Sequence, residues 1–571
     1  MEFAINVSVV KHLPLTTIAA AASACVLMSA CSGGSDPDPG LLATRASPAS
    51  ACSALAGMAI APARIGLPTT GGTVDSATFV AANASGNSNG EYCLVQGAIH
   101  PASAGAPDIK FQANLPTNWN KRSLHMGGSG YNGAVVTGLA PIAFAPTAKS
   151  ALSRGYATFG SDSGHQSALA VPSSDASFAL NDEALQNYGY AHIKKTHDAV
   201  VEVLKAYFGA NVDFKSYFAG GSTGGREALT AVQRFPADYD GVYAGSPTAI
   251  FWGVRMAGFP VGRAAYATPG GYLNQAKQAL VYQRSTAACD ALDGVADGLV
   301  SNVSACKAIA ATTSASLRCA SGTDEGNHCL SDAQLGVINT LHNGLTLPYE
   351  MAFNSTRYSG YNALEGTDFS VNNFTLGLGN SATLVDPLNN TANGYLFAQG
   401  AQWLRYFVAK DPTFNPLSFD PQNPGLYKQR IVDLSAIVGA ENPDLSAFKA
   451  RGGKLIMLQG LADTAVSPNG TIDYYGRVVN RLGQNNVDEF LRFYTVPGMG
   501  HGVGAFVPSW DVLAALDAWV SEGSAPNALI GTDTSTATLG RTRPLCRFPA
   551  WPKYQGSGDV NAASSFACST L

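Results

Sequence analysis

One stretch of the chain places a serine between a strand-like run and a helix-like run. Residues 215–221 are Lys-Ser-Tyr-Phe-Ala-Gly-Gly, and the helix-favouring run Glu-Ala-Leu-Thr-Ala-Val follows at 227–232. Between them lies Gly220-x-Ser222-x-Gly224, whose small residues let the backbone turn sharply and lift the serine hydroxyl clear of it. The helix N-terminus adds unpaired N–H groups that favour developing negative charge. The stretch therefore predicts a nucleophilic serine at a strand-to-helix turn.

The Gly-x-Ser-x-Gly pattern alone is weak evidence in a glycine-rich chain. The sequence has 61 glycines, so about one match is expected by chance. Ser88, in Gly-Asn-Ser-Asn-Gly, is such a match, but no strand-like run precedes it and no helix-like run follows it. We interpret Ser88 as a loop residue and Ser222 as the candidate nucleophile.

The C-terminal third supplies a candidate acid and a candidate base. Asp463 follows the buried-strand run at 454–460, and His501 follows a second strand-like run at 489–496. Open α/β sheets place their chemistry just past the carboxyl ends of such strands. We therefore expect Asp463 to orient His501, which activates Ser222. The alternatives are a turn-capping aspartate and a surface-loop histidine; His165 is the main rival base, and we interpret it as structural or pocket-lining.

The oxyanion of an acyl-transfer intermediate needs two backbone donors. One is expected from Thr223, the residue after the nucleophile. A glycine-rich segment, Gly127-Gly128-Ser129-Gly130, follows the polar segment at 119–122. We predict Gly127 as the second donor, with an ordinary glycine-rich turn as the alternative.

These motifs together resemble the tannase and feruloyl esterase family of α/β-hydrolases, which includes hydrolases of mono(2-hydroxyethyl) terephthalate. The resemblance runs from about Cys52 to Cys568 and is also carried by Arg234-Phe235-Pro236, Tyr239-Asp240-Gly241 and Arg543-Pro544-Leu545-Cys546. It implies an α/β fold with a mostly parallel, doubly wound sheet. It also implies a hydrolase core at 52–249 and 447–571, interrupted at 250–446 by a lid domain that carries the pocket for an aromatic acid.

Two positions depart from the family pattern. The residue before the nucleophile and the residue after the catalytic histidine are usually cysteines that form a bridge, but here they are Gly221 and Gly502. Such a bridge would close a loop of nearly three hundred residues and, in the chain-entropy model, would be worth about 5 kcal/mol. Without it we expect a more mobile His501 loop.

The N-terminus has the pattern of an export signal. Residues 1–31 contain an alanine-rich apolar run after Lys11, and Leu-Met-Ser-Ala-Cys31 resembles a bacterial lipoprotein cleavage site, so Cys31 is a candidate for lipidation. Residues 32–51 have the composition of a flexible tether. We expect an exported protein, in the periplasm, on the outer membrane or outside the cell, without any other segment that could span a membrane.

Eight cysteines remain after the leader, an even count that suits an oxidising compartment. Sequence alone allows 105 connectivities for eight cysteines. The resemblance implies four pairs of neighbours in the chain: Cys52 with Cys93, Cys289 with Cys306, Cys319 with Cys329, and Cys546 with Cys568.

The composition fits an exported globular enzyme, which we expect to be a monomer. Hydrophobic residues make up 46% and charged residues 13% of 571 residues, which is enough for a sizeable core. The formal net charge is −5, without long runs of either sign. This balance gives no indication of a nucleic-acid partner.

The lid contains an aspartate-rich loop at 290–299. Three aspartates with interleaved glycines form an oxygen-rich turn that suits a hard cation, although the spacing is not that of an EF-hand. The resemblance implies a structural Ca²⁺ here, held by Asp290, Asp293 and Asp297 through carboxylates and by Val295 and Leu299 through carbonyls. An Asx-turn cluster without metal is the alternative.

The substrate is the least determined feature. The lid is rich in aromatic residues, of which we expect only two or three to line the pocket. The stretch at 369–377, where terephthalate-ester hydrolases of the family carry an arginine, has none; Arg357 and Arg405 are the alternatives. We therefore favour an ester of a feruloyl or galloyl acid over one of the terephthalate type. Other classes left open are a non-catalytic ligand-binding lipoprotein and an acyltransferase.

Overall fold

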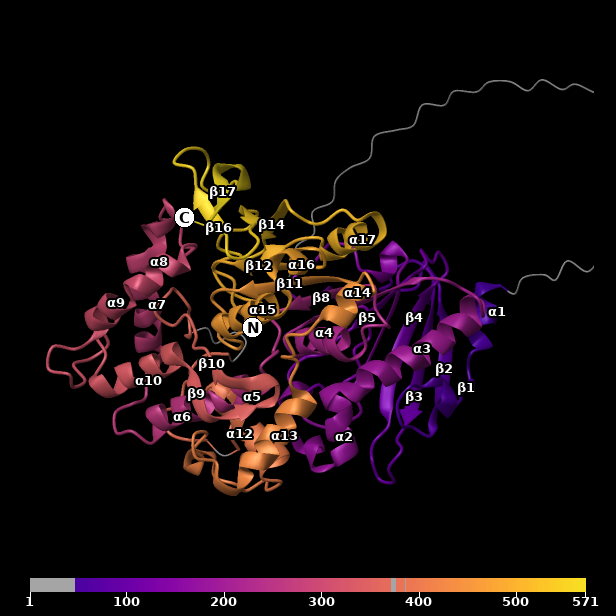
Figure 1. The fold of residues 1–571 in the computed structure, drawn as a ribbon, viewed down its shortest axis with the longest axis horizontal. Helices are drawn as coiled ribbons and strands as arrows, with labels where there is room; N and C mark the ends of the chain where they lie inside the picture. Colours follow the sequence, from indigo (N-terminus) through magenta and orange to yellow (C-terminus); the bar gives the residue numbers. More distant parts are fainter. Residues whose placement is uncertain (1–46, 371–375, 386, 571) are drawn as a thin grey trace, which may run out of the picture. The chain divides into compact units, whose positions relative to one another are not determined.

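A mixed sheet of ten strands organises the computed structural model, which describes residues 47–370, 376–385 and 387–570 (Figure 1). The strand order is β1-β2-β3-β4-β6-β5-β7-β8-β11-β12. Pairings from β1 to β6 are antiparallel, and those from β6 to β12 are parallel. The strands are β1 (Ala59–Ile60), β2 (Gly71–Val80), β3 (Tyr92–His100), β4 (Ile109–Pro116), β5 (Arg122–Met126), β6 (Ala157–Ser161), β7 (Lys215–Gly221), β8 (Gly241–Gly245), β11 (Lys454–Gly460) and β12 (Leu491–Val496).

The parallel half of the sheet is covered on both faces, as expected for a doubly wound α/β fold. Along β7, Phe218 packs in the cluster that includes α3 (His192–Phe208), α4 (Thr223–Arg234) and α15 (Pro468–Leu482). Its neighbours Tyr217 and Ala219 pack in the opposite cluster with α17 (Val512–Glu522). This alternation follows from the two-residue period of a strand. The predicted strands at β7, β11 and β12 and the helix at α4 are confirmed.

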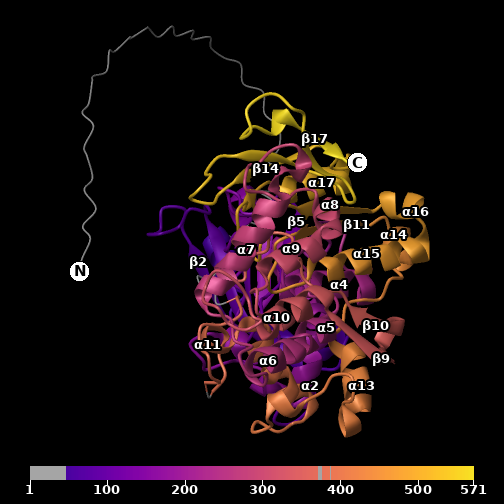
Figure 2. The same ribbon diagram turned by 90° about the vertical axis from the view of Figure 1, so that its left-hand side faces the viewer.

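A long insertion separates β8 from β11. Its elements are α5 (Phe251–Met256), α6 (Gly258–Tyr266), α7 (Gln275–Cys289), α8 (Val303–Ala308), α9 (Ala310–Leu317), α10 (Asp332–Asn343), β9 (Leu345–Met351), β10 (Ser355–Tyr358), α11 (Asn390–Asn393), α12 (Tyr395–Trp403) and α13 (Lys428–Val438); α14 (Ser446–Ala450) follows it and packs in the core. Figure 2 looks onto α7, α9 and α10, which lie together at one end of the insertion. Its two ends meet where the N–H of Ala440 donates to the carbonyl of Ala249, 2.9 Å away. Ala440 and Leu445 pack against α4. The chain has therefore rejoined the hydrolase core before residue 446, the predicted end of the lid.

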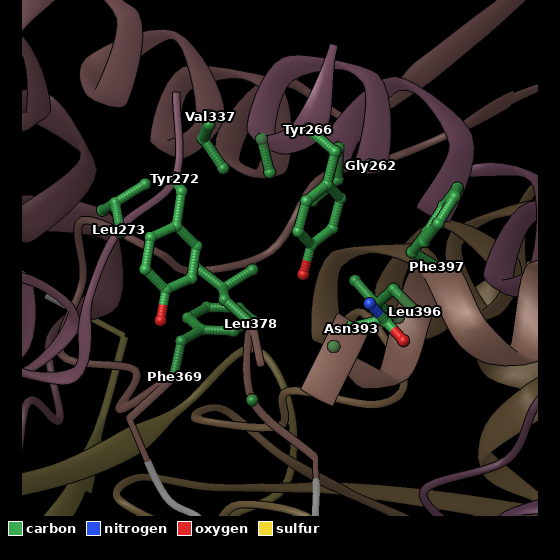
Figure 3. A pocket seen from close by; sticks show the side chains of 14 residues that line it. Gly262, Tyr266, Tyr272, Leu273, Val337, Phe369, Leu378, Asn393, Leu396 and Phe397 are labelled. Atoms are coloured by element: carbon green, nitrogen blue, oxygen red, sulfur yellow. The ribbon is translucent and has the colours of Figure 1, made fainter. Parts of the chain in front are cut away.

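The hydrophobic core of the insertion includes Trp252, Trp403 and Phe407 and is continuous with Tyr131 and Tyr188 of the hydrolase core. Within it lies a cavity of about 20 Å³, toward which Tyr266, Tyr272 and Phe397 point (Figure 3). A space of this size holds about one water molecule. It is a packing defect of the insertion core and is too small for a substrate.

The remaining elements flank the sheet. They are α1 (Pro48–Ser53), α2 (Asp182–Gln186), α16 (Gln484–Asp488), the three-stranded sheet of β13 (Pro508–Ser509), β14 (Leu529–Asp533) and β15 (Thr542–Leu545), and the pair β16 (Trp551–Tyr554) and β17 (Phe566–Ser569). The four predicted disulfides are all formed: Cys52–Cys93, Cys289–Cys306, Cys319–Cys329 and Cys546–Cys568.

The predicted tether ends earlier than residue 51. Pro48–Ser53 is a helix because Ser47 caps its N-terminus, Pro48 occupies its first position and the buried Cys52 is bonded to Cys93. The leader, Cys31 and the rest of the tether lie outside the described residues. Within the part of the chain that is described, no helix is both long enough and apolar enough to cross a membrane.

Candidate active site

Ser222 occupies the turn between β7 and α4 in a strained backbone conformation. Its φ and ψ are 59° and −121°, a region that non-glycine residues rarely adopt. The Ser222 N–H donates to the carbonyl of Gly245 (2.9 Å), and the Ser222 carbonyl accepts from the N–H and the hydroxyl of Thr248 (3.2 and 3.1 Å). A Cβ at Gly220 would lie 2.4 Å from the carbonyl oxygen of Gly224. The turn therefore requires glycine two residues before the serine, as the motif predicts.

Asp463 and His501 are brought together at the carboxyl ends of β11 and β12. His501 Nδ1 lies 2.8 Å from Asp463 Oδ2. Asp463 is fully buried, and its Oδ1 accepts from the N–H groups of Ala465 and Val466 at 2.9 and 2.8 Å. The carboxylate thus caps a turn through Oδ1 and contacts the imidazole through Oδ2, so the turn-capping arrangement and the contact with His501 occur together.

Ser222 and His501 line the same pocket, whose volume is about 530 Å³. This is within the usual range for small-molecule sites. Its wall comes from the segment after β5, from residues 140–144 and 171–174, from the elbow, and from Leu376, Asn390, Tyr395 and Gln399 of the insertion. Apart from His501, none of the described residues that line it has an ionisable side chain other than the phenol of Tyr395.

The prediction that Gly127 supplies an oxyanion donor is wrong in this structure. The Gly127 N–H donates to the carbonyl of Ala219 at 3.0 Å, because the pairing of β5 with β7 continues one residue beyond Met126. The next N–H, of Gly128, donates to Glu227 Oε2 at 2.9 Å. By contrast, the N–H groups of Thr223 and Ser129 have no partner among the described residues, and Thr223 is the first residue of α4.

His165, the rival base, is structural. It is 3% exposed, stacks on Phe178 with ring centroids 3.6 Å apart, and its Nε2 lies 2.8 Å from the carbonyl oxygen of Tyr131. Burial lowers the pKa of His165 to about 4. It does not line the pocket that holds Ser222.

The loop at 290–299 offers oxygen atoms without partners. Asp293 Oδ2 is buried and accepts no hydrogen bond, and burial raises the pKa of Asp293 to about 6. The carbonyls of Val295 and Leu299 accept no hydrogen bond from any described residue. These unpaired oxygens are of the type that a hard cation binds.

The other two aspartates of this loop have partners within the chain. Asp290 accepts from the N–H groups of Asp297 and Gly298 at 3.1 and 2.9 Å, and Asp297 pairs with Arg543. Among the described residues, two clusters each bring three possible metal-ligand side chains together, with the ligand atoms of a cluster within 4.8 Å of one another. Neither cluster lies in the loop at 290–299. One group contains the bonded pair Cys319–Cys329, and in the other the ammonium of Lys194 already contacts Asp198 and Asp238.

Sequence reasoning missed two residues that shape the pocket. Phe144 packs beside His501, and Glu227 ties the loop after β5 to α4. Neither belongs to a recognisable motif. Of the lid aromatics, Tyr395 lines the pocket and Phe374 lies outside the described residues. Arg357 lines a different cavity, and Arg405 donates to the carbonyl of Phe414; neither reaches the pocket.

The parallel sheet, the serine elbow and the acid–histidine pair past the ends of β11 and β12 define an α/β-hydrolase. The family model described as tannase and feruloyl esterase matches residues 93–569. The chain belongs to this family and is an esterase.

Relatives and solved structures agree with this assignment. An uncharacterized esterase of Agrobacterium fabrum is 43% identical over 528 residues, 90% of this chain and 92% of the relative. A mono(2-hydroxyethyl) terephthalate hydrolase of Piscinibacter sakaiensis is 33% identical over 531 residues, 84% of this chain and 85% of the relative. The fold is similar to the crystal structure of feruloyl esterase B from Aspergillus oryzae, with a TM-score of 0.72 and 24% identity over 92% of this chain and 100% of that one.

Proposed function

We propose that the protein hydrolyses esters of aromatic carboxylic acids by a two-step serine mechanism. The observation that carries the proposal is the placement of Ser222 and His501 on one pocket, with His501 bound to the buried Asp463. His501 Nδ1 donates to Asp463, so Nε2 is the atom left to accept the hydroxyl proton of Ser222. The serine oxygen then attacks the ester carbonyl. His501 returns the proton to the leaving alcohol, and water cleaves the acyl-enzyme by the same route.

The candidate oxyanion donors are the backbone N–H groups at the pocket that have no hydrogen-bond partner among the described residues. Thr223, at the N-terminus of α4, is the first donor, and the helix dipole adds to its effect. Ser129 replaces Gly127 as the candidate second donor, because it lines the pocket and its N–H has no described partner. The loop at 290–299 is proposed to hold a structural Ca²⁺ that braces the insertion without taking part in the reaction.

The pocket lining favours an uncharged acyl group of the feruloyl or galloyl type. A substrate carboxylate would need a cationic partner, and none of the described lining residues has a lysine or arginine side chain. Residues 371–375, which precede Leu376 in the chain, carry no charged side chain in the sequence. Asn390, Gln399 and the hydroxyls of Ser173 and Ser174 can instead bond phenolic and methoxy oxygens.

A terephthalate-type monoester is the second candidate, and one buried cation favours it. Arg255 is 1% exposed, lies over the rings of Tyr131 and Phe251 at 4.6 and 4.8 Å, and interacts with the phenol of Tyr395. Its Nε and Nη1 have no hydrogen-bond partner among the described residues. A positive charge behind Tyr395 would favour an anionic group in the pocket. The Piscinibacter sakaiensis relative is named for such a substrate.

Export to an oxidising compartment is proposed from the leader pattern and the four disulfides. Lipidation of Cys31 and a monomeric state belong to the same proposal. Mass spectrometry of the protein from a cell envelope would show whether the mature chain begins at a lipid-modified Cys31.

The test of the function is hydrolysis of methyl ferulate, methyl gallate, mono(2-hydroxyethyl) terephthalate and p-nitrophenyl acetate, with Ser222→Ala as the control. We expect turnover of methyl ferulate or methyl gallate that Ser222→Ala abolishes without lowering the melting temperature. A kcat/KM for the terephthalate monoester at least tenfold above those for the phenolic esters would select the second candidate. Full activity of Ser222→Ala would refute the mechanism.

A further inference from the structure

The ring of Phe144 fills the space between the nucleophile elbow and the candidate catalytic histidine. Its centroid lies 5.1 Å from that of the His501 imidazole, with the two planes at 62°. A Cβ built on Gly221, the residue before Ser222, would lie 2.5 and 2.6 Å from two ring carbons, and one on Gly245 would lie 2.9 Å away. A Cβ built on Gly502 would lie 3.7 Å from the opposite ring edge. The ring thus contacts both segments that must meet for proton transfer.

Phe144 is held in this place by its backbone. Its φ is 60°, a strained conformation that a bulky residue rarely adopts and that persists only where the surrounding contacts offset the strain. The Phe144 carbonyl accepts from Trp510 Nε1 at 3.1 Å, and the Pro146 carbonyl accepts from the Ser509 hydroxyl at 2.7 Å. Ser509 and Trp510 follow the His501 loop in the chain. The turn that carries Phe144 is therefore anchored to the segment that carries the histidine.

We propose that Phe144 is a positioning residue that holds the His501 imidazole beside Ser222. The inference rests on the proposed Ser222–His501 mechanism. Asp463 holds the imidazole at one atom, Nδ1, and the edge of Phe144 restrains the rest of the ring. A side chain at Gly221 would overlap the Phe144 ring, and one at Gly245 would overlap both that ring and the hydroxyl of Tyr243.

The first test compares Phe144→Ala with Phe144→Leu. Removing the ring is expected to lower kcat about ten- to hundredfold, because a displacement of about 1 Å can cost a hundredfold. KM is expected to change less than about twofold, and leucine should recover part of the lost kcat. Phe214→Ala is the matched control: Phe214 is also half-buried but packs on Trp119 with the rings 5.6 Å apart, away from the pocket. A rise in KM at unchanged kcat would show that Phe144 only contacts substrate and would overturn the proposal.

The second test uses the close approach at Gly221, whose φ is not in the left-handed region, so alanine fits its backbone. Gly221→Ala should lower kcat when Phe144 is present, because its Cβ displaces the ring. In a Phe144→Ala background the same substitution should cost much less, because the remaining close contact of its Cβ is with Ala143 Cβ at 2.7 Å. Losses that multiply in the double variant would show that the two positions act independently and would overturn the proposal.

Reaction with a fluorophosphonate separates the inference from the function on which it rests. The reagent phosphonylates an activated serine, with the serine oxygen displacing fluoride, and needs no substrate recognition. If wild-type Ser222 is not labelled, the proposed mechanism fails. If it is labelled and Phe144→Ala reacts equally fast, with an unchanged melting temperature, the mechanism holds and the role of Phe144 is refuted.

Discussion

Replacing Asp463 by asparagine tests how much of the activity depends on the orientation of one imidazole. The asparagine side chain would keep the shape of the aspartate but offer only one acceptor oxygen. That oxygen is best placed at the position of Oδ1, where two N–H groups donate at 2.9 and 2.8 Å. The amide NH₂ would then face Nδ1 of His501 and Nε2 of Gln459, which lies 3.3 Å from Oδ2. Two donors cannot bond to each other, so His501 must change its tautomer.

The change of tautomer sets the expected loss of kcat in Asp463→Asn. With Nδ1 as the acceptor, Nε2 carries the proton and points a donor at Ser222, so it cannot take the proton of the hydroxyl. A substitution of this kind lowers kcat by about 10⁴, which corresponds to about 5 kcal/mol of transition-state stabilisation. The pocket and the elbow are untouched, so KM should stay within about threefold.

The assay is steady-state hydrolysis of p-nitrophenyl acetate and methyl ferulate, with the melting temperature measured in parallel. Asp533→Asn is the control, because Asp533 is also buried and accepts from the N–H groups of Val507 and Ser535, but it lies outside the pocket. The control should lose stability and keep kcat. An Asp463→Asn variant that folds normally and retains more than about a tenth of wild-type kcat would refute the role of Asp463.

Three further predictions concern stability. Because the pKa of His165 is lowered to about 4, the free energy of unfolding of the wild-type protein should fall by up to about 3 kcal/mol as pH falls from about 6.5 to 4. His165→Gln should lack this loss. Urea unfolding of both proteins at pH 7.5 and 4.5 measures it, and an equal pH dependence in the two proteins would contradict the prediction. Chelating Ca²⁺ should lower the melting temperature of wild-type protein but not of Asp293→Asn; equal responses would contradict the calcium site. Removing the Cys52–Cys93 bridge, which spans 41 residues, should lower the free energy of unfolding by about 4 kcal/mol, and removing Cys319–Cys329, which spans 10, by about 3 kcal/mol. A larger loss for the shorter loop in denaturant unfolding would contradict loop entropy as the cause.

The sequence predicts the parts of the site that local pattern controls. The apolar runs at β7, β11 and β12 are buried strands, and their order in the chain locates Ser222, Asp463 and His501 at one edge of the sheet. Asp463 and His501 are 38 residues apart and still form a 2.8 Å contact, because parallel strands align their carboxyl ends. The disulfide pairs follow from the family resemblance and could not have been chosen from spacing.

Contacts set by register and by distant packing escape such reasoning. A glycine run indicates close approach of the backbone but does not show which N–H group stays free. Gly127 is paired because β5 and β7 are in a register that reaches one residue further than the strand pattern suggests. Phe144 lies in an irregular loop, and its importance depends on two glycines, Gly221 and Gly245, that are about 80 and 100 residues away.

Glu227 explains how the loop after β5 and the nucleophile keep a fixed geometry. It lies one turn into α4, is 1% exposed, and accepts from the Gly128 N–H at 2.9 Å and from Asn132 Nδ2 at 2.7 Å. The N–H of Gly224, in the first turn of the same helix, donates to the carbonyl of Gly128 at 2.9 Å. One helix thus presents the Thr223 N–H and anchors the loop that carries Ser129. Because both candidate oxyanion donors are tied to α4, a shift of the helix moves them together with Ser222 and preserves their spacing.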